Sequence, residues 1–266
     1  MTSPTIDRRT VQLRGGSLPV HVQVAGSGPA LVYLHPAGGL AWDGFLHKLA
    51  DRYTVYAPEL PGSSPENPEA LDAVAELPDL VEVYVELLKE LDLDRPAIVG
   101  QSFGGMLAAE IGAHSPDLVT QLVLLAPLGL WRDDAPVADL WNTPFEQLPA
   151  LLFHDPAGPA ATAFFTFPED PALREQALAG VGQALKSSGK FVAPKPEKGL
   201  SGRLHRITAP TLVVWGREDA LNPAVYAEGF RSGIPGSTVE VIPGSGHIVQ
   251  VEKEAATLAV VSAFLK

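Results

Sequence analysis

Short apolar segments alternate with segments of helical periodicity along most of this chain, and no other feature of the sequence constrains the fold as strongly. The runs RPAIVG (95–100), TQLVLLAP (120–127) and APTLVVWG (209–216) are almost wholly apolar, as strands buried on both faces of a parallel sheet are. Between such runs lie segments like DLVEVYVELLKELDLD (79–94), in which leucines and valines recur on one helical face. The alternation predicts an α/β fold with a mostly parallel sheet and helices on both faces.

The alternation lapses between residues 128 and 205, where Pro, Ala and Phe are frequent and only short helical pieces are expected. We therefore expect one α/β core, made of residues 1–127 and 206–266, interrupted by a helical cap over residues 128–205. Two strand-like runs near the start, joined by a Gly-Gly turn signal, predict a hairpin that precedes the parallel strands.

The excess of acidic residues limits the kinds of molecule that the protein is expected to bind. The chain has 19 Lys and Arg residues against 31 Asp and Glu residues, and a net charge of −12 would repel nucleic acid and anionic membrane surfaces. It has no Cys, which excludes disulfides and thiolate chemistry. The first residues lack the apolar core of a secretion signal, and no run reaches the length of a membrane span. We expect a cytoplasmic protein with a small-molecule substrate, in an oligomeric state that stays open.

One serine lies between glycines at the junction of a buried strand and a helix. Gly100-Gln101-Ser102-Phe103-Gly104 fits the G-x-S-x-G pattern, in which a tight turn raises the serine above the sheet. The flanking glycines allow the strand and the helix to approach closely. At a helix N-terminus, free N–H groups favour a developing negative charge. The pattern predicts a nucleophilic serine.

A serine hydroxyl needs a base to accept its proton and an acid to orient that base. Asp219 follows the strand TLVVWG, and His247 follows the next strand in the Gly-rich loop GSGHIV. Because the C-terminal ends of parallel strands share one sheet edge, Ser102, Asp219 and His247 are expected to converge there. Asp133 or Asp134 is the alternative acid, in which case Asp219 would only cap the helix after it.

Attack of a serine on a carbonyl creates an oxyanion that needs hydrogen-bond donors. The backbone N–H groups of Phe103 and of Ala37, in the loop HPAGG, are the expected donors, and His35 is expected to support that loop. The other histidines lack a partner at metal-ligand spacing, so no metal is expected. No dinucleotide or phosphate-binding loop occurs, and no cofactor is expected.

The chain resembles α/β-hydrolase fold serine hydrolases of the esterase and carbon–carbon hydrolase branch. The stretches that carry the resemblance are LHPAGG, ELPGSSP, GQSFGGMLA, PTLVVWGREDALNP and GSGHIVQVEKE. The resemblance covers nearly the whole chain. It implies an eight-stranded type of sheet with an inserted cap, and it makes Ser102 the nucleophile, His247 the base and Asp219 the acid. The chain departs from the family pattern at Pro36, commonly Gly, at Gln101, commonly His or Asn, and in the loop ELPGSSPEN. Serine in place of Asp as nucleophile disfavours haloalkane dehalogenase and epoxide hydrolase chemistry.

The expected function is a carboxylesterase that cleaves small to medium apolar esters through an acyl-enzyme. Aromatic residues of the cap are expected to wall the substrate pocket, namely Trp131, Trp141, Phe145, Phe153, Phe164, Phe165 and Phe167. Hydrolysis of a carbon–carbon bond in a diketone-like substrate, thioester cleavage and perhydrolysis are alternatives that use the same three residues. A catalytically silent ligand receptor is the alternative of another class.

Overall fold

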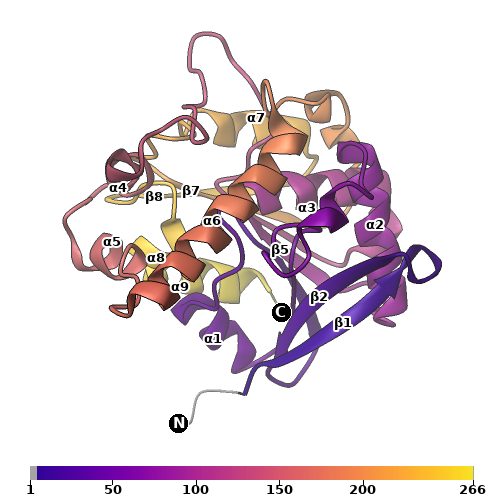
Figure 1. The fold of residues 1–266 in the computed structure, drawn as a ribbon. Coiled ribbons are helices and arrows are strands. Elements are labelled where there is room, and N and C mark those ends of the chain that lie inside the picture. The colour runs from indigo at the N-terminus through magenta and orange to yellow at the C-terminus, as the bar shows by residue number, and fades with distance from the viewer. Residues whose placement is uncertain (1–4, 266) are drawn as a thin grey trace.

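A computed structural model describes residues 5–265, and its strands form one eight-stranded sheet (Figure 1). The order is β1-β2-β4-β3-β5-β6-β7-β8. The strands are β1 (Asp7–Leu13), β2 (Leu18–Ala25), β3 (Ala30–Leu34), β4 (Thr54–Pro58), β5 (Ala97–Gln101), β6 (Leu122–Leu125), β7 (Thr211–Gly216) and β8 (Thr238–Ile242). β2 pairs antiparallel with β1 and β4, and all other neighbours are parallel. The predicted α/β class, the mostly parallel sheet and the initial hairpin are confirmed.

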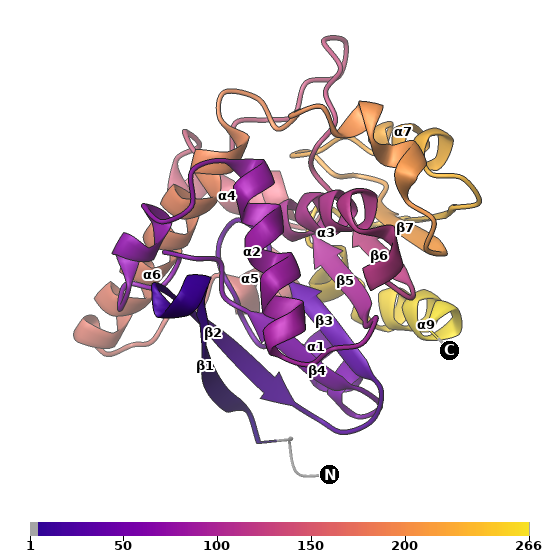
Figure 2. The same cartoon turned by 90° about the vertical axis from the view of Figure 1, so that its right-hand side faces the viewer.

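Helices cover both faces of this sheet (Figure 2). The α-helices are α1 (Gly44–Ala50), α2 (Leu77–Glu90), α3 (Phe103–His114), α4 (Leu148–Leu152), α5 (Pro159–Phe164), α6 (Pro171–Val192), α7 (Tyr226–Gly233), α8 (Val249–Glu252) and α9 (Glu254–Phe264). Short 3-10 turns occupy Arg14–Gly16, Pro68–Leu71, Pro116–Leu118, Phe145–Gln147, Leu200–Gly202 and Leu204–Arg206. None of the helices within the described residues combines the length and hydropathy needed to cross a lipid bilayer.

Side chains that alternate along the central strands build two cores, one on each face of the sheet. On β3, Leu31 and Tyr33 pack with α1 and α9, whereas Val32 and Leu34 pack with α2 and α3. Because both faces are buried, these strands are apolar at almost every position, as the sequence pattern predicts; Gln101 at the end of β5 and Thr211 at the start of β7 are the polar ones. The two cores fix the sheet rigidly, so the loops at its C-terminal edge have a stable base.

The segment between β6 and β7 contains α4, α5 and α6, and we refer to it below as the cap. That residues 128–205 form a separate cap stays a prediction. The expectation of only short helical pieces is wrong for α6, which runs over 22 residues across the molecule (Figure 1). Asp170 caps this helix by accepting hydrogen bonds from the N–H groups of Ala172 and Leu173, and Pro171 occupies its first turn. One face of its C-terminal half is buried, and this packing offsets the low helix propensity of its internal glycines.

Candidate active site

Ser102 lies on the tight turn between β5 and α3, with a positive φ of 55° and a ψ of −114°. Such a φ is unfavourable for a residue with a side chain, and the surrounding packing maintains it. A Cβ on Gly100 would come within 2.3 Å of the carbonyl oxygen of Gly104, and a Cβ on Gly104 within 2.0 Å of that of Leu34. Only glycine permits this close approach of strand and helix, so the sequence pattern and the strained turn have one cause.

His247 lies between Ser102 and Asp219 and forms hydrogen bonds to both. Its Nε2 is 2.7 Å from the Ser102 Oγ, and its Nδ1 is 2.8 Å from the Asp219 Oδ2. Because a carboxylate only accepts, Nδ1 carries the proton and Nε2 is free to accept the serine proton. The other carboxylate oxygen of Asp219 accepts hydrogen bonds from the N–H groups of Leu221 (3.0 Å) and Asn222 (2.8 Å), which fixes its orientation. The three predicted side chains therefore meet at the C-terminal edge of the sheet.

The alternative acids lie elsewhere. The Asp133 side chain is 92% exposed and accepts a hydrogen bond from the indole Nε1 of Trp131. This bond and the charge of Lys195 lower the pKa of Asp133. Asp134 pairs with Arg132 in the same exposed loop. Neither carboxylate forms a hydrogen bond to His247, so the geometry favours Asp219 over both.

Two carboxylates hold the loop that carries the histidine. Glu218, at the end of β7, accepts hydrogen bonds from the N–H groups of Gly244 (2.7 Å) and Ser245 (3.1 Å). Glu252, on α8, accepts one from the N–H of Gly246 (2.6 Å). Hydrogen bonds to a charged acceptor are stronger than those between neutral groups. The backbone that precedes the histidine is therefore held at three successive amides.

The cap completes this support. The N–H of His247 donates to the carbonyl of Leu152, at the end of α4, over 2.8 Å. Glu252 also accepts hydrogen bonds from the cap N–H groups of His154 (3.1 Å) and Asp155 (2.8 Å). The Glu252 carboxylate thus joins the cap to the histidine loop. We name this group of contacts the histidine anchor; it comprises Glu252, residues 152–155 and residues 244–247.

No sequence pattern assigns Glu218 or Glu252 a role. Both are close in sequence to predicted site residues, Glu218 next to Asp219 and Glu252 shortly after His247, and this proximity is the one signal that was present. Gln101 was singled out only as an unusual neighbour of the serine. Its side-chain amide donates to the carbonyl of His247 over 3.2 Å, which adds a further contact to the histidine.

The two expected oxyanion donors have free N–H groups. Within residues 5–265 neither Ala37 nor Phe103 uses its backbone N–H in a hydrogen bond, and Phe103 is the first residue of α3. His35 supports the loop as expected, since Nδ1 donates to the carbonyl of Pro36 (2.7 Å) and Nε2 accepts from the N–H of Leu60 (3.0 Å). Burial lowers the pKa of His35, in keeping with this neutral form.

A cavity of about 530 Å³ opens beside Ser102 and His247. Among the predicted aromatic residues, Phe145, Phe164, Phe165 and Phe167 line it. Its other lining residues are mostly apolar and come from the cap and from the core, namely Leu140, Leu148, Leu152, Ala163, Val181, Leu185, Pro36, Ala37, Leu40, Ala41, Ile248 and Val251. Such a lining favours an apolar ligand.

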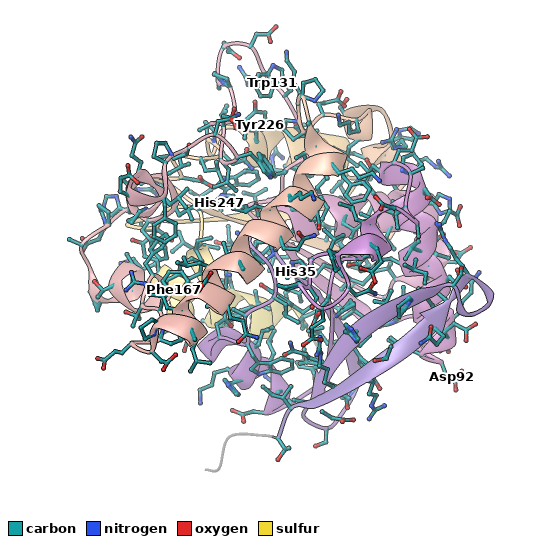
Figure 3. The ribbon with its side chains drawn as sticks, viewed as in Figure 1. His35, Asp92, Trp131, Phe167, Tyr226 and His247 are labelled. Carbon is teal, nitrogen blue, oxygen red and sulfur yellow. The ribbon has the colours of Figure 1, made fainter. Side chains whose placement is uncertain are left out.

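Three predicted pocket residues do not line this cavity. Trp131 lies at the tip of an exposed loop, far from His247 in Figure 3, with the Lys195 ammonium 4.6 Å from its ring centroid. Trp141 uses its indole Nε1 to donate to the carbonyl of Leu185 within the cap. Phe153 is buried and packs against Phe164 and Phe165, which belong to the aromatic wall of the cavity, defined here as Phe145, Phe164, Phe165 and Phe167. Aromatic composition alone did not distinguish side chains that line a pocket from those that pack inside a cap.

Comparison with known proteins agrees with this architecture. Residues 31–260 match the alpha/beta hydrolase family. The chain is 28% identical over 239 residues to a pimeloyl-[acyl-carrier protein] methyl ester esterase of Nitrosomonas europaea, covering 86% of this chain and 92% of that protein. It is 26% identical over 255 residues to a 2-hydroxy-6-oxo-6-phenylhexa-2,4-dienoate hydrolase of Burkholderia cepacia, covering 88% and 86%.

Solved structures share the fold. A meta-cleavage product hydrolase from Pseudomonas fluorescens matches with a TM-score of 0.77 at 20% identity, covering 97% of each chain. A naproxen esterase from Bacillus subtilis matches with a TM-score of 0.77 at 18% identity, covering 99% of this chain and 92% of the other. Since the family match spans most of the chain and these structures share its fold, the protein belongs to the alpha/beta hydrolase family.

Proposed function

We propose that this hydrolase cleaves carboxylic esters by nucleophilic catalysis through an acyl-enzyme. The observation that supports the proposal most is the continuous hydrogen-bond chain from Ser102 through His247 to Asp219, beside a largely apolar cavity. All three residues are buried, with exposed fractions of 2%, 1% and 6%. Water is therefore largely excluded from these bonds, which strengthens them.

In the first half of the reaction, Ser102 Oγ attacks the ester carbonyl carbon while His247 Nε2 takes its proton. The carbonyl oxygen becomes an oxyanion, which the N–H groups of Ala37 and Phe103 stabilise. Asp219 keeps the imidazole oriented and offsets its positive charge. When the tetrahedral intermediate collapses, His247 returns the proton to the departing alcohol and the acyl group stays on Ser102.

In the second half, water takes the place of the alcohol. His247 accepts a proton from this water, whose oxygen attacks the acyl carbon and again forms an oxyanion at the same donors. Collapse of this intermediate releases the carboxylic acid and returns the proton to Ser102 Oγ. The histidine anchor keeps the imidazole in one place through both halves, because each step needs Nε2 within hydrogen-bond reach of the reacting oxygen.

The cavity favours neutral esters of small to medium size. Its volume of about 530 Å³ falls in the range of pockets that enclose small organic molecules. Within the described residues no Lys or Arg lines it, and Asp43 is its one carboxylate. The relative that acts on a phenylhexadienoate takes an anion, for which this cavity offers no cationic partner. The lining therefore supports an ester in preference to a dienoate.

A fluorophosphonate probe tests the proposal directly. The native protein should be labelled on Ser102, and labelling should be lost on heating and in Ser102→Ala. The matched control is Ser115→Ala, which removes a hydroxyl at the opposite end of α3 and should leave labelling intact. A folded protein that the probe does not label would refute the serine mechanism and favour a silent ligand receptor.

A panel of p-nitrophenyl esters of increasing acyl length then tests the substrate class. An esterase should show kcat/KM that rises with acyl length until the chain fills the cavity. A protein that the probe labels but that turns over dienoate-type ketones far better than any ester would contradict ester hydrolysis while keeping the nucleophile.

A further inference from the structure

The two walls of the cavity differ in chemistry. The wall formed by the cap contributes only apolar side chains, among them four phenylalanines. The wall formed by the core contributes every polar side chain, and three of these, Tyr33, Asp43 and Gln250, have no part in the proposed reaction. Polar side chains in an otherwise apolar pocket commonly fix the orientation of a ligand. These three therefore need an explanation of their own.

The three residues lie on one side of the site. Tyr33 is on β3 and points to the face of the sheet that α1 covers. Asp43 is the N-cap of α1, and Gln250 is on α8, which packs against α1. Burial and, to a lesser degree, the nearby charge of Asp43 raise the pKa of the Tyr33 phenol. The cavity thus has a polar corner, defined here as Tyr33, Asp43 and Gln250, between β3, α1 and α8.

The polar corner has unused hydrogen-bonding capacity. Gln250 is 3% exposed, and its Oε1 has no hydrogen-bond partner within residues 5–265. Asp43 accepts a hydrogen bond from the N–H of Leu46 with Oδ1, and no Lys or Arg of the described residues forms an ion pair with it. A buried polar group without a partner is costly, and native proteins retain one mainly where it serves a ligand, water or ion.

The strongest charge near Asp43 is the Glu254 carboxylate, with a smaller opposite contribution from His47. The carboxylate of Glu254 lies against Gly44, where an added Cβ would come within 2.2 Å of its Oε2. Burial and, to a lesser degree, Glu254 raise the pKa of Asp43 to about 6. A second carboxylate from a ligand would add to this repulsion. An ammonium group would lose its hydration in a cavity that is otherwise apolar.

We infer that the polar corner is a substrate subsite that takes a neutral hydrogen-bonding group, such as a hydroxyl, on the chain of an ester. A hydroxyl can donate to the Gln250 Oε1 or to Asp43 and accept from the phenol of Tyr33, so the Gln250 carbonyl can gain the partner that it lacks. The inference rests on the proposed ester hydrolysis and adds a substrate class to it: hydroxylated esters, in preference to purely alkyl ones and to half-esters of dicarboxylic acids.

Matched ester series test this subsite. Each series carries a terminal hydroxyl, methyl, carboxylate or ammonium group at the same position, placed once on the acyl side and once on the alcohol side, over a range of chain lengths. At the best chain length, the hydroxyl ester should have a kcat/KM at least equal to that of the methyl ester. Without the subsite, the unpaired hydroxyl in an apolar cavity would lower the kcat/KM of the hydroxyl ester about tenfold below that of the methyl ester. A preference for methyl, ammonium or carboxylate at every length would overturn the inference.

Variants locate the effect. Gln250→Leu keeps the volume and should lower the hydroxyl-to-methyl ratio of kcat/KM about tenfold. Leu148→Met, on the cap wall, is the matched control, and it should change both esters by the same factor and leave the ratio as in the wild type. Asp43→Asn retains an acceptor for the N–H of Leu46 and should raise turnover of the carboxylate ester about tenfold. If neither Gln250→Leu nor Asp43→Asn changes the hydroxyl-to-methyl ratio of kcat/KM, the polar corner does not contact substrate.

Binding separates this inference from the proposed function. In Ser102→Ala, calorimetry compares a hydroxyl-terminated methyl ester with its methyl-terminated analogue. If the wild-type protein hydrolyses no ester but this variant binds the hydroxylated ligand about tenfold more tightly, ester hydrolysis fails and the subsite stands. If esters are hydrolysed and the two ligands bind equally, the subsite fails and the hydrolase stands.

Discussion

Replacing Asp43 by Asn should stabilise the fold at alkaline pH and have little effect at acid pH. Asp43 is largely buried, and burial is the main cause that raises its pKa from 3.8 to about 6. The folded protein therefore holds the Asp43 proton more tightly than the unfolded chain does. As the pH rises from about 4 through about 6, that proton is lost, and the free energy of unfolding falls. Asn is neutral at every pH and still accepts the hydrogen bond from the N–H of Leu46.

The size of this effect follows from the two pKa values. Each tenfold difference in proton affinity corresponds to about 1.4 kcal/mol, so a change from 3.8 to about 6 gives a full penalty of about 3 kcal/mol at high pH. At about pH 4 the penalty is only about 0.5 kcal/mol. The stability of Asp43→Asn relative to the wild type should therefore rise by about 2 to 3 kcal/mol between pH 4 and pH 8.

Urea unfolding of both proteins at the two pH values measures this difference, because other titrating groups cancel in the comparison. Asp72→Asn is the matched control, because it removes one carboxylate at an exposed position. An Asp43→Asn protein that is destabilised by the same amount at both pH values would refute the reasoning. It would mean that the Asp43 carboxylate is solvated or paired in the folded protein.

Three further substitutions probe the site itself. Asp219→Asn should lower kcat for ester hydrolysis by about 10⁴-fold, whereas Asp133→Asn should not change it; the reverse result would move the acid to the loop after β6. Glu252→Ala leaves three backbone N–H groups unpaired and should lower kcat more than tenfold with a smaller change in KM. Fluorophosphonate labelling of this variant at the wild-type rate would contradict the role of the histidine anchor. Gly246→Ala places a Cβ within 2.7 Å of the Leu152 carbonyl oxygen and should lower both Tm and kcat. An unchanged Tm would show that the cap backbone moves to accommodate the Cβ without loss of stability.

The central fold was predictable because one physical pattern determines it. Strands such as β5 and β6 are buried on both faces and therefore almost wholly apolar, and the glycines around Ser102 are required by the close contact of strand and helix. The order of Ser102, Asp219 and His247 along the chain then predicts which loops meet at one sheet edge. The strands and the serine turn follow from local sequence, and the meeting of the three loops follows from the order of the elements along the chain.

The cap and the polar corner were less predictable because tertiary contacts determine them. α6 contains Gly180, Gly182 and Gly189, which disfavour a helix, but one face of its C-terminal half is buried, and this packing stabilises it. Tyr33, Asp43 and Gln250 occur in three separate elements with no shared motif, so their proximity emerges only when β3, α1 and α8 are packed together. For the same reason the sequence alone could not separate Phe145 from Phe153.

The histidine anchor also limits how cap segments can be exchanged between related hydrolases. A grafted cap must present a carbonyl where Leu152 stands and two backbone N–H donors where His154 and Asp155 stand. A chimera that fills the pocket well but lacks these three groups would leave the imidazole free to tilt, and it would bind substrate without turning it over. Swapped caps are therefore best joined outside residues 152–155, with specificity altered through the aromatic wall instead.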